Sequence, residues 1–154
     1  MDRKNKYSLL TTFFLIIILV WIVLAYFQPE KKVYQFPSPV EVVRLYFASW
    51  DNKNYSDMYS TFSDGFKHLE PTAQDLASFR AYVMSQNITA VTLHDFSETS
   101  NDGETATVVY DVEFTLSDGK HLPFQGTFTL KNRQSDIIRG WKLIHPYGEK
   151  IDTA

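Results

Sequence analysis

The sequence contains no cysteine. This absence excludes a disulfide framework, a thiolate metal site, a cysteine nucleophile and a lipid-modified N-terminal cysteine. Basic residues are also few, because 15 Lys and Arg stand against 18 Asp and Glu and give a formal net charge of -3. The chain therefore lacks the basic surface that domains binding nucleic acid carry.

Sequence motifs for catalysis and for cofactors are absent as well. The four histidines show no metal-binding spacing, and Ser49, Ser60 and Ser63 have no nucleophile-elbow context. No glycine-rich loop precedes a helix in a way that would hold phosphate. His94 and Asp95 would form a metal or general-base pair only with partners that the sequence does not place. We therefore predict no catalytic residue, no metal and no cofactor.

Two acids on one predicted strand, Asp111 and Glu113, are the remaining candidates for an active site. They alternate with Tyr110 and Phe114, so both acids face solvent if the aromatic side chains face the core. A register shift of one residue would reverse the two faces of the strand. We predict a solvated face for the two acids.

What the sequence does have is a long apolar run near its N-terminus. Residues 9–27 carry no charge. At about 1.5 Å per residue, such a run is just long enough to cross a hydrocarbon core of about 30 Å. We predict a transmembrane anchor at residues 8–27, embedded in the lipid bilayer. A cleaved signal peptide is the alternative, but the run is long for one and residues 25–27 make a poor cleavage site.

The charges around this run predict its orientation. Arg3, Lys4 and Lys6 precede it, which favours a cytoplasmic N-terminus at residues 1–7, although Lys31 and Lys32 on the far side weaken the bias. We expect a single-pass protein of the cytoplasmic membrane, with a proline-containing linker at residues 28–38 and the C-terminal domain outside.

The helix on which the predicted domain is built starts after Ser38. Ser38 and Glu41 predict a capping box, and Pro39 suits the first helical position. A helix with apolar residues around most of its circumference needs cover on two sides, which a curved sheet gives. The apolar positions are Val40, Val42, Val43, Leu45, Tyr46, Phe47 and Trp50.

The rest of the chain predicts two more helices and then four strands. Helical patterns cover residues 55–62, ended by Asp64-Gly65, and residues 72–86, started by Thr72 and Asp75. Alternating patterns predict strands at 88–96, 106–116, 122–130 and 137–144, with turns at 101–104 and 118–119. Residues 39–154 therefore form an α+β domain, with three helices packed in a curved antiparallel four-stranded sheet.

Two stretches resemble the nuclear-transport-factor-2-like superfamily. Residues 42–59 are similar to its opening helix, polar turn and Tyr-x-x-Met-Tyr second helix, and residues 140–143 are similar to its last strand. Within the superfamily, the chain is most similar to the non-catalytic N-terminal domain of low-affinity class B penicillin-binding proteins. The resemblance implies a cone-shaped domain whose open end can hold a ligand. No acyl-serine machinery is present, so transpeptidation is not implied.

Aromatic residues make up 16% of the chain, and most are predicted to be core. Tyr46, Trp50 and Tyr110 are the candidates for lining a pocket, because each carries a polar group on an apolar body. We expect a membrane-anchored, non-catalytic binding module of the bacterial cell envelope, with an envelope protein or a cell-wall component as partner. The alternatives are a small hydrolase or isomerase that uses the cone, and an envelope subunit of a secretion or conjugation apparatus.

Overall fold

The computed structural model describes residues 17–21 and 36–145, and the chain divides into two compact units, Met1–Gln35 and Phe36–Ala154. In the first unit, residues 17–21 are helical and exposed, and the rest of the predicted anchor at 8–27 lies outside the described residues. Across the described parts of the chain, no helix is long and apolar enough to span a bilayer.

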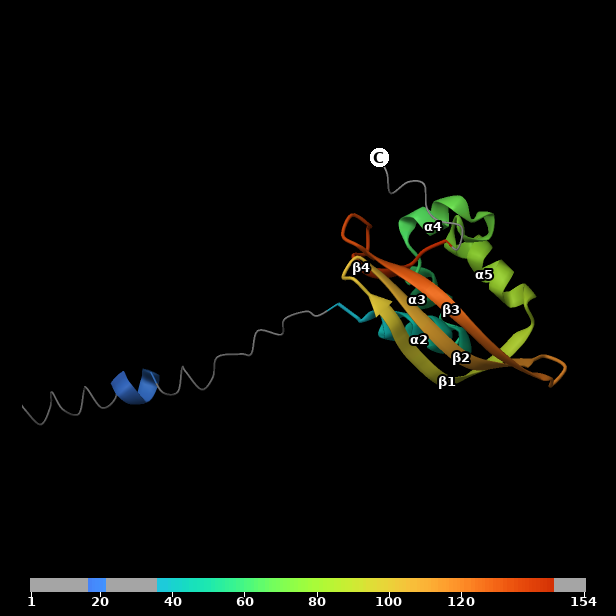
Figure 1. Ribbon diagram of the computed structural model, residues 1–154, viewed down its shortest axis with the longest axis horizontal. Helices are drawn as coiled ribbons and strands as arrows, with labels where there is room; N and C mark the ends of the chain where they lie inside the picture. The colour runs from blue at the N-terminus through green and yellow to red at the C-terminus, as the bar shows by residue number, and fades with distance from the viewer. Residues whose placement is uncertain (1–16, 22–35, 146–154) are drawn as a thin grey trace, which may run out of the picture. The chain divides into compact units, whose positions relative to one another are not determined.

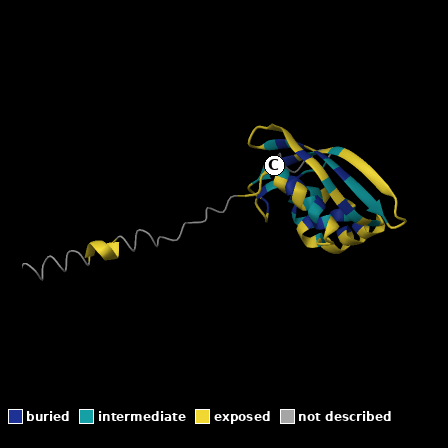
Figure 2. Cartoon of the chain, turned by 90° about the horizontal axis from the view of Figure 1, so that it is seen from below, coloured by how far each residue is buried: buried dark blue, intermediate teal, exposed yellow. Residues whose placement is uncertain are grey.

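The second unit is an α+β domain with one antiparallel sheet in the order β1-β2-β3-β4 (Figure 1). The helices lie on one face of this sheet (Figure 2). The elements are α2 (Pro39–Asp51), α3 (Tyr55–Ser60), α4 (Asp64–Leu69), the 3-10 turn η1 (Pro71–Ala73), α5 (Leu76–Ser85), β1 (Ile88–Asn101), β2 (Thr105–Leu116), β3 (His121–Arg133) and β4 (Gly140–Leu143). The predicted α+β class and the four-stranded antiparallel sheet are confirmed.

Helix α2 begins as predicted. The Glu41 amide donates to Ser38 Oγ at 3.3 Å, and the Ser38 amide donates to Glu41 Oε2 at 2.6 Å, which completes the capping box. Val43 and Phe47, four residues apart on one face, are fully buried against the sheet. Leu45 is exposed, so the apolar stripe is narrower than predicted, because the side of α2 that carries Leu45 is left uncovered.

The sheet curves around α2 because β1 is irregular. Its pairing with β2 shifts register between Ile88 and Ala90, between Leu93 and Asp95, and between Glu98 and Ser100. Extra residues of this kind bend a strand and increase its twist. The bend brings the inner face of the sheet around the helix, and Figure 2 shows the buried residues gathered between the two layers.

The alternation in β2 has the predicted register. Ala106, Val108, Tyr110 and Val112 are buried on the helix side of the sheet. The residues between them therefore point to the other face, which no described helix covers. This register determines where every acid of the strand lies.

Helix α4 is missing from the prediction, which treated Asp64-Gly65 as a helix end. Ser63 instead caps a new helix, because its Oγ accepts from the Phe66 amide at 2.9 Å. Asp64 is held from outside the helix, since its carboxylate accepts from the Ile137 amide at 2.9 Å. The start of α4 is therefore stabilised by a contact between residues 73 positions apart in sequence, and a local sequence pattern could not reveal this helix.

Boundaries of three further elements also differ from the prediction. Helix α5 is capped by Asp75, which accepts from the Ser78 amide at 2.8 Å, whereas Thr72 lies in η1. Strand β1 continues to Asn101 because β2 pairs with it to that point. Strand β4 starts at Gly140 rather than at residue 137. The loop before it is hydrogen-bonded to α4 instead of pairing with β3, and its Ile137 side chain is 92% exposed.

Candidate functional site

A cavity of about 430 Å³ lies between the helices and the last two strands of the sheet. Its wall combines residues from α2, from the segment between α3 and α5, from α5 itself, and from β3, β4 and the residue after β4. They are Tyr46, Phe62, Phe66, Glu70, Thr72, Ala73, Phe79, Tyr82, Thr127, Phe128, Thr129, Leu143 and Ile144. This volume is within the range of sites for small molecules.

Six of the thirteen residues that line the cavity are aromatic. The Phe62 ring stacks on Phe66 at a centroid distance of 4.3 Å and meets Phe79 edge-on at 5.3 Å. Tyr46 contacts Phe62 and Phe128 edge-on, both at 5.6 Å. Contacts of this geometry add to the burial of apolar surface and restrict how the rings move. The wall is therefore preformed rather than assembled by a ligand.

Backbone hydrogen bonds to β4 hold the central ring of this wall. The Leu143 amide donates to the Thr61 carbonyl at 2.9 Å, and the Ser63 amide donates to the Leu143 carbonyl at 3.0 Å. Phe62, which lies between Thr61 and Ser63 in the chain, forms a parallel β-bridge with Leu143. The segment after α3 thus continues the sheet beyond β4 and directs the Phe62 ring into the cavity.

The Tyr46 hydroxyl is one of the polar groups in the cavity wall. Burial raises the pKa of Tyr46 well above its ordinary value, and the neighbouring Tyr110 and Tyr82 raise it further. At neutral pH the phenol is therefore protonated and can donate a hydrogen bond. Among residues 36–145 its hydroxyl has no hydrogen-bond partner. It is available to a ligand that offers an acceptor.

An acid and a histidine meet at this cavity. Glu70 accepts hydrogen bonds from Thr72, from Oγ1 at 2.8 Å and from the amide at 3.2 Å, and His145 Nε2 lies 3.6 Å from its second oxygen. The Thr72 bonds, with a smaller effect of His145, lower the pKa of Glu70. Its carboxylate is therefore ionised at neutral pH. Sequence reasoning missed this pair because its members are 75 positions apart and belong to no motif.

The structure separates the three residues that the sequence predicted to line a pocket. Tyr46 lines the cavity. Trp50 is half-buried and packs on Phe114 at 5.3 Å, and Tyr110 is buried and stacks on Phe128 at 4.8 Å. Neither Trp50 nor Tyr110 is part of the cavity wall.

The ionisable residues considered from the sequence lie away from the cavity. His94 and Asp95 are exposed on β1. Asp111 and Glu113 are half-buried on the outer face of the sheet, where Asp111 accepts from Gln125 at 2.7 Å and Glu113 contacts His121 at 2.9 Å. In the described part of the chain, no group of three potential metal ligands comes together.

No protein-family model matches the chain, and no curated protein matches its sequence. Solved structures do match. A SEC-C motif containing protein from Psychrobacter arcticus is 10% identical, with a TM-score of 0.52, and the match covers 75% of this chain and 63% of that one. A SEC-C motif containing protein from Rhodopseudomonas palustris is 16% identical, with a TM-score of 0.51, and the match covers 70% of this chain and 76% of that one. The chain thus spans less than two thirds of the Psychrobacter protein.

Structures with the nuclear-transport-factor-2-like fold are also among the matches. One is a candidate dehydratase of that family from Streptomyces avermitilis, at 13% identity and a TM-score of 0.45, with 66% of this chain and 86% of that one covered. At these identities the matches concern the fold alone, which is a curved antiparallel sheet with helices on its inner face.

Proposed function

We propose that this protein is a single-pass, membrane-anchored binding module of the bacterial cell envelope, with its α+β domain outside the cytoplasmic membrane. The uncharged run at residues 9–27, preceded by Arg3, Lys4 and Lys6, supports the anchor and its orientation. Residues 42–59 and 140–143 support a relationship to the non-catalytic N-terminal domain of low-affinity class B penicillin-binding proteins. The domain acts by binding.

The observation that carries the binding role is the aromatic cavity with the Tyr46 phenol in its wall. Ring faces and edges from Tyr46, Phe62 and Phe128 favour a flat apolar ligand. A neutral Tyr46 hydroxyl favours a ligand with a hydrogen-bond acceptor, such as a carbonyl oxygen. The ionised Glu70 disfavours a ligand that carries negative charge at its exposed end.

A second function is favoured by Glu70 and His145. A carboxylate beside an imidazole can transfer protons, so a hydrolase or isomerase that uses this cavity is the alternative. However, both oxygens of Glu70 are already engaged, and the Thr72 bonds cap η1. These bonds give Glu70 a structural role that requires no substrate. We therefore retain catalysis as the second candidate.

Calorimetric titration of the full-length protein tests the binding role. The probes are 2-acetylnaphthalene and 2-ethylnaphthalene, which share a ring system and differ in the carbonyl. We expect the acetyl compound to bind about fivefold to tenfold more tightly, because it accepts from Tyr46, and we expect Tyr46→Phe to abolish this preference. Equal affinities of the wild-type protein for both probes would contradict the role of the phenol.

A substrate screen separates binding from catalysis. Esters, epoxides and ketosteroids are incubated with the wild-type protein and with Glu70→Gln, and Glu113→Gln on the outer face of the sheet serves as the matched control. We expect no turnover by any of the three proteins. Turnover that Glu70→Gln removes and Glu113→Gln retains would establish the enzyme instead.

Protease protection tests the anchor. Added to intact spheroplasts, a protease should digest the domain after residue 27, while a tag at residue 1 stays protected. Protection of the domain would show that the proposed orientation is wrong.

A further inference from the structure

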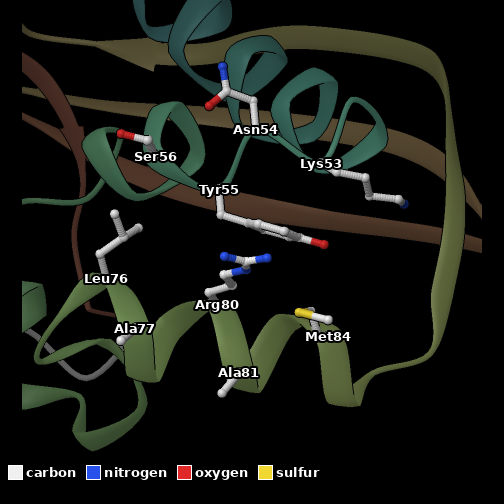
Figure 3. Close-up of a pocket in the computed structure, with 9 residues that line it drawn as sticks. All are labelled: Lys53, Asn54, Tyr55, Ser56, Leu76, Ala77, Arg80, Ala81 and Met84. Atoms are coloured by element: carbon white, nitrogen blue, oxygen red, sulfur yellow. The ribbon is translucent and has the colours of Figure 1, made fainter.

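A groove of about 930 Å³ separates α5 from the start of α3 (Figure 3). It shares no residue with the wall of the aromatic cavity. One side is the exposed face of α5, and the other is the turn into α3. The lining residues are Lys53, Asn54, Tyr55, Ser56, Leu76, Ala77, Arg80, Ala81 and Met84.

The groove is positively charged although the chain as a whole is acidic. Its lining holds Lys53 and Arg80 and no carboxylate. Lys53 Nζ donates to the Thr89 carbonyl at 2.8 Å, which holds this charge in place. Arg80 forms no ion pair with any residue among 36–145, and its guanidinium lies 5.7 Å from the centre of the Tyr55 ring. Figure 3 shows this guanidinium under the ring, in the middle of the groove.

Apolar residues flank Arg80 at helical spacing. Leu76 lies four residues before it and Met84 four residues after it, and these side chains are 40% and 56% exposed. Eight residues of helix correspond to about 12 Å, or two turns. Ala77 and Ala81, between them, have small side chains that allow another backbone to come close. This face of α5 therefore carries one cationic side chain, Arg80, between two exposed apolar side chains, Leu76 and Met84.

We propose that this groove binds a helix of a partner protein that carries a Glu or Asp midway between two large apolar residues, at positions i-4 and i+4. The central acid meets Arg80, whose planar fork pairs with a carboxylate through two hydrogen bonds. The flanking apolar residues cover Leu76 and Met84, in the manner of a helix bound in a groove. This proposal shares one premise with the proposed function, which is that the domain acts by binding another molecule.

The charge of the groove argues against a second copy of the chain as the occupant. Two antiparallel α5 helices related by a twofold axis would place Arg80 opposite Arg80, and like charges at the centre of an interface are unfavourable. An acidic partner removes this repulsion. Charge complementarity therefore favours a different protein.

Fluorescence anisotropy with the full-length protein in detergent micelles tests the proposal. The probes are labelled alanine-rich peptides of about 18 residues, long enough to be helical, with Leu, a central residue and Leu spaced by four. The central residue is Glu, Gln or Lys. We expect the Glu peptide to bind at least about tenfold more tightly than the Gln peptide. Arg80→Glu should reverse the preference in favour of the Lys peptide.

The chain offers a matched control. Arg44 also lies over an aromatic ring, 4.8 Å from the centre of Phe96, but outside the groove, so Arg44→Glu makes the same charge change at another site. Arg44→Glu should leave the order of peptide affinities unchanged. Ala77→Gln, which fills the groove at an exposed position, should weaken binding of the Glu peptide, and circular dichroism checks that each variant is folded.

Several outcomes would overturn the proposal. These are equal binding of the Glu and Gln peptides, equal effects of Arg44→Glu and Arg80→Glu, or no peptide binding at millimolar concentration. Binding of decanoate instead of the peptides, lost in Arg80→Gln, would assign the groove to small amphipathic acids. Titration with 2-acetylnaphthalene distinguishes this failure from failure of the proposed function, because the cavity should bind that probe equally in Arg80→Glu.

Discussion

Gly126 allows Tyr110 to lie across the inner face of the sheet. The two residues are directly opposite in the pairing of β2 with β3. A Cβ atom on Gly126 would come within 2.7 Å of Tyr110 Cζ, which is closer than non-bonded carbon atoms can approach. Tyr110 in turn contacts Phe47 and Phe128, both at 4.8 Å between ring centroids. Gly126→Ala therefore forces the Tyr110 ring out of the core contacts that it makes.

The expected change in the free energy of unfolding of Gly126→Ala is the sum of two opposing effects. Overpacking of a core typically destabilises by about 1–3 kcal/mol. Replacing a glycine in a strand by alanine returns about 0.5–1 kcal/mol, because the unfolded chain loses freedom. We expect Gly126→Ala to lower the free energy of unfolding by about 1–2 kcal/mol.

A double-mutant cycle measured by urea unfolding tests this reasoning. Tyr110→Leu removes the atoms that clash and keeps an apolar side chain. In that background, Gly126→Ala should be neutral or should stabilise by about 0.5 kcal/mol. The coupling energy between the two positions is then about 1–2.5 kcal/mol. Additive effects of the two substitutions would refute the close approach of Tyr110 to β3.

Three further predictions concern single residues of the α+β domain. Trp50→Ala should cost about 2 kcal/mol in urea unfolding, less than the 3–5 kcal/mol of a fully buried tryptophan, because Trp50 is half-buried against Phe114. Ser63→Ala should cost about 1–2 kcal/mol, since the buried Ser63 caps α4, whereas Ser117→Ala in the β2–β3 turn should have little effect. Burial raises the pKa of Tyr46, so only the unfolded state releases this proton just above pH 10. Stability should therefore fall as pH rises beyond about 10, and Tyr46→Phe should reduce that fall between pH 8 and 11.

Features that depend on neighbours in sequence were predictable. The capping box at Ser38 and Glu41 consists of two hydrogen bonds across three residues, so its pattern is visible in the chain itself. The alternation in β2 is equally local, because one face of the strand is buried along its length. The turn at residues 118–119 and the order of helices before strands follow from the same kind of signal.

Features that depend on distant residues were not predictable. The loop before β4 holds the start of helix α4 through a hydrogen bond from the Ile137 amide to Asp64. For this reason residues 137–139 are not part of a strand, although the sequence predicted one at 137–144. Tyr46, Phe62 and Phe128 form one wall although they come from a helix, an edge segment and a strand. Sequence periodicity indicates which side chains are buried, but not which of them leave space between them.

The sequence by itself therefore determined the class of the domain, the start of its first helix and the faces of its strands, because burial and capping repeat at short range. The tertiary structure decided where the cavity lies, that Tyr46 reaches it while Trp50 and Tyr110 do not, and that Glu70 meets His145. It also decided that Arg80 lies in a groove beside Tyr55, with no ion pair to any residue among 36–145. Each of these depends on how the helices pack against the curved sheet, which no short stretch of the chain encodes.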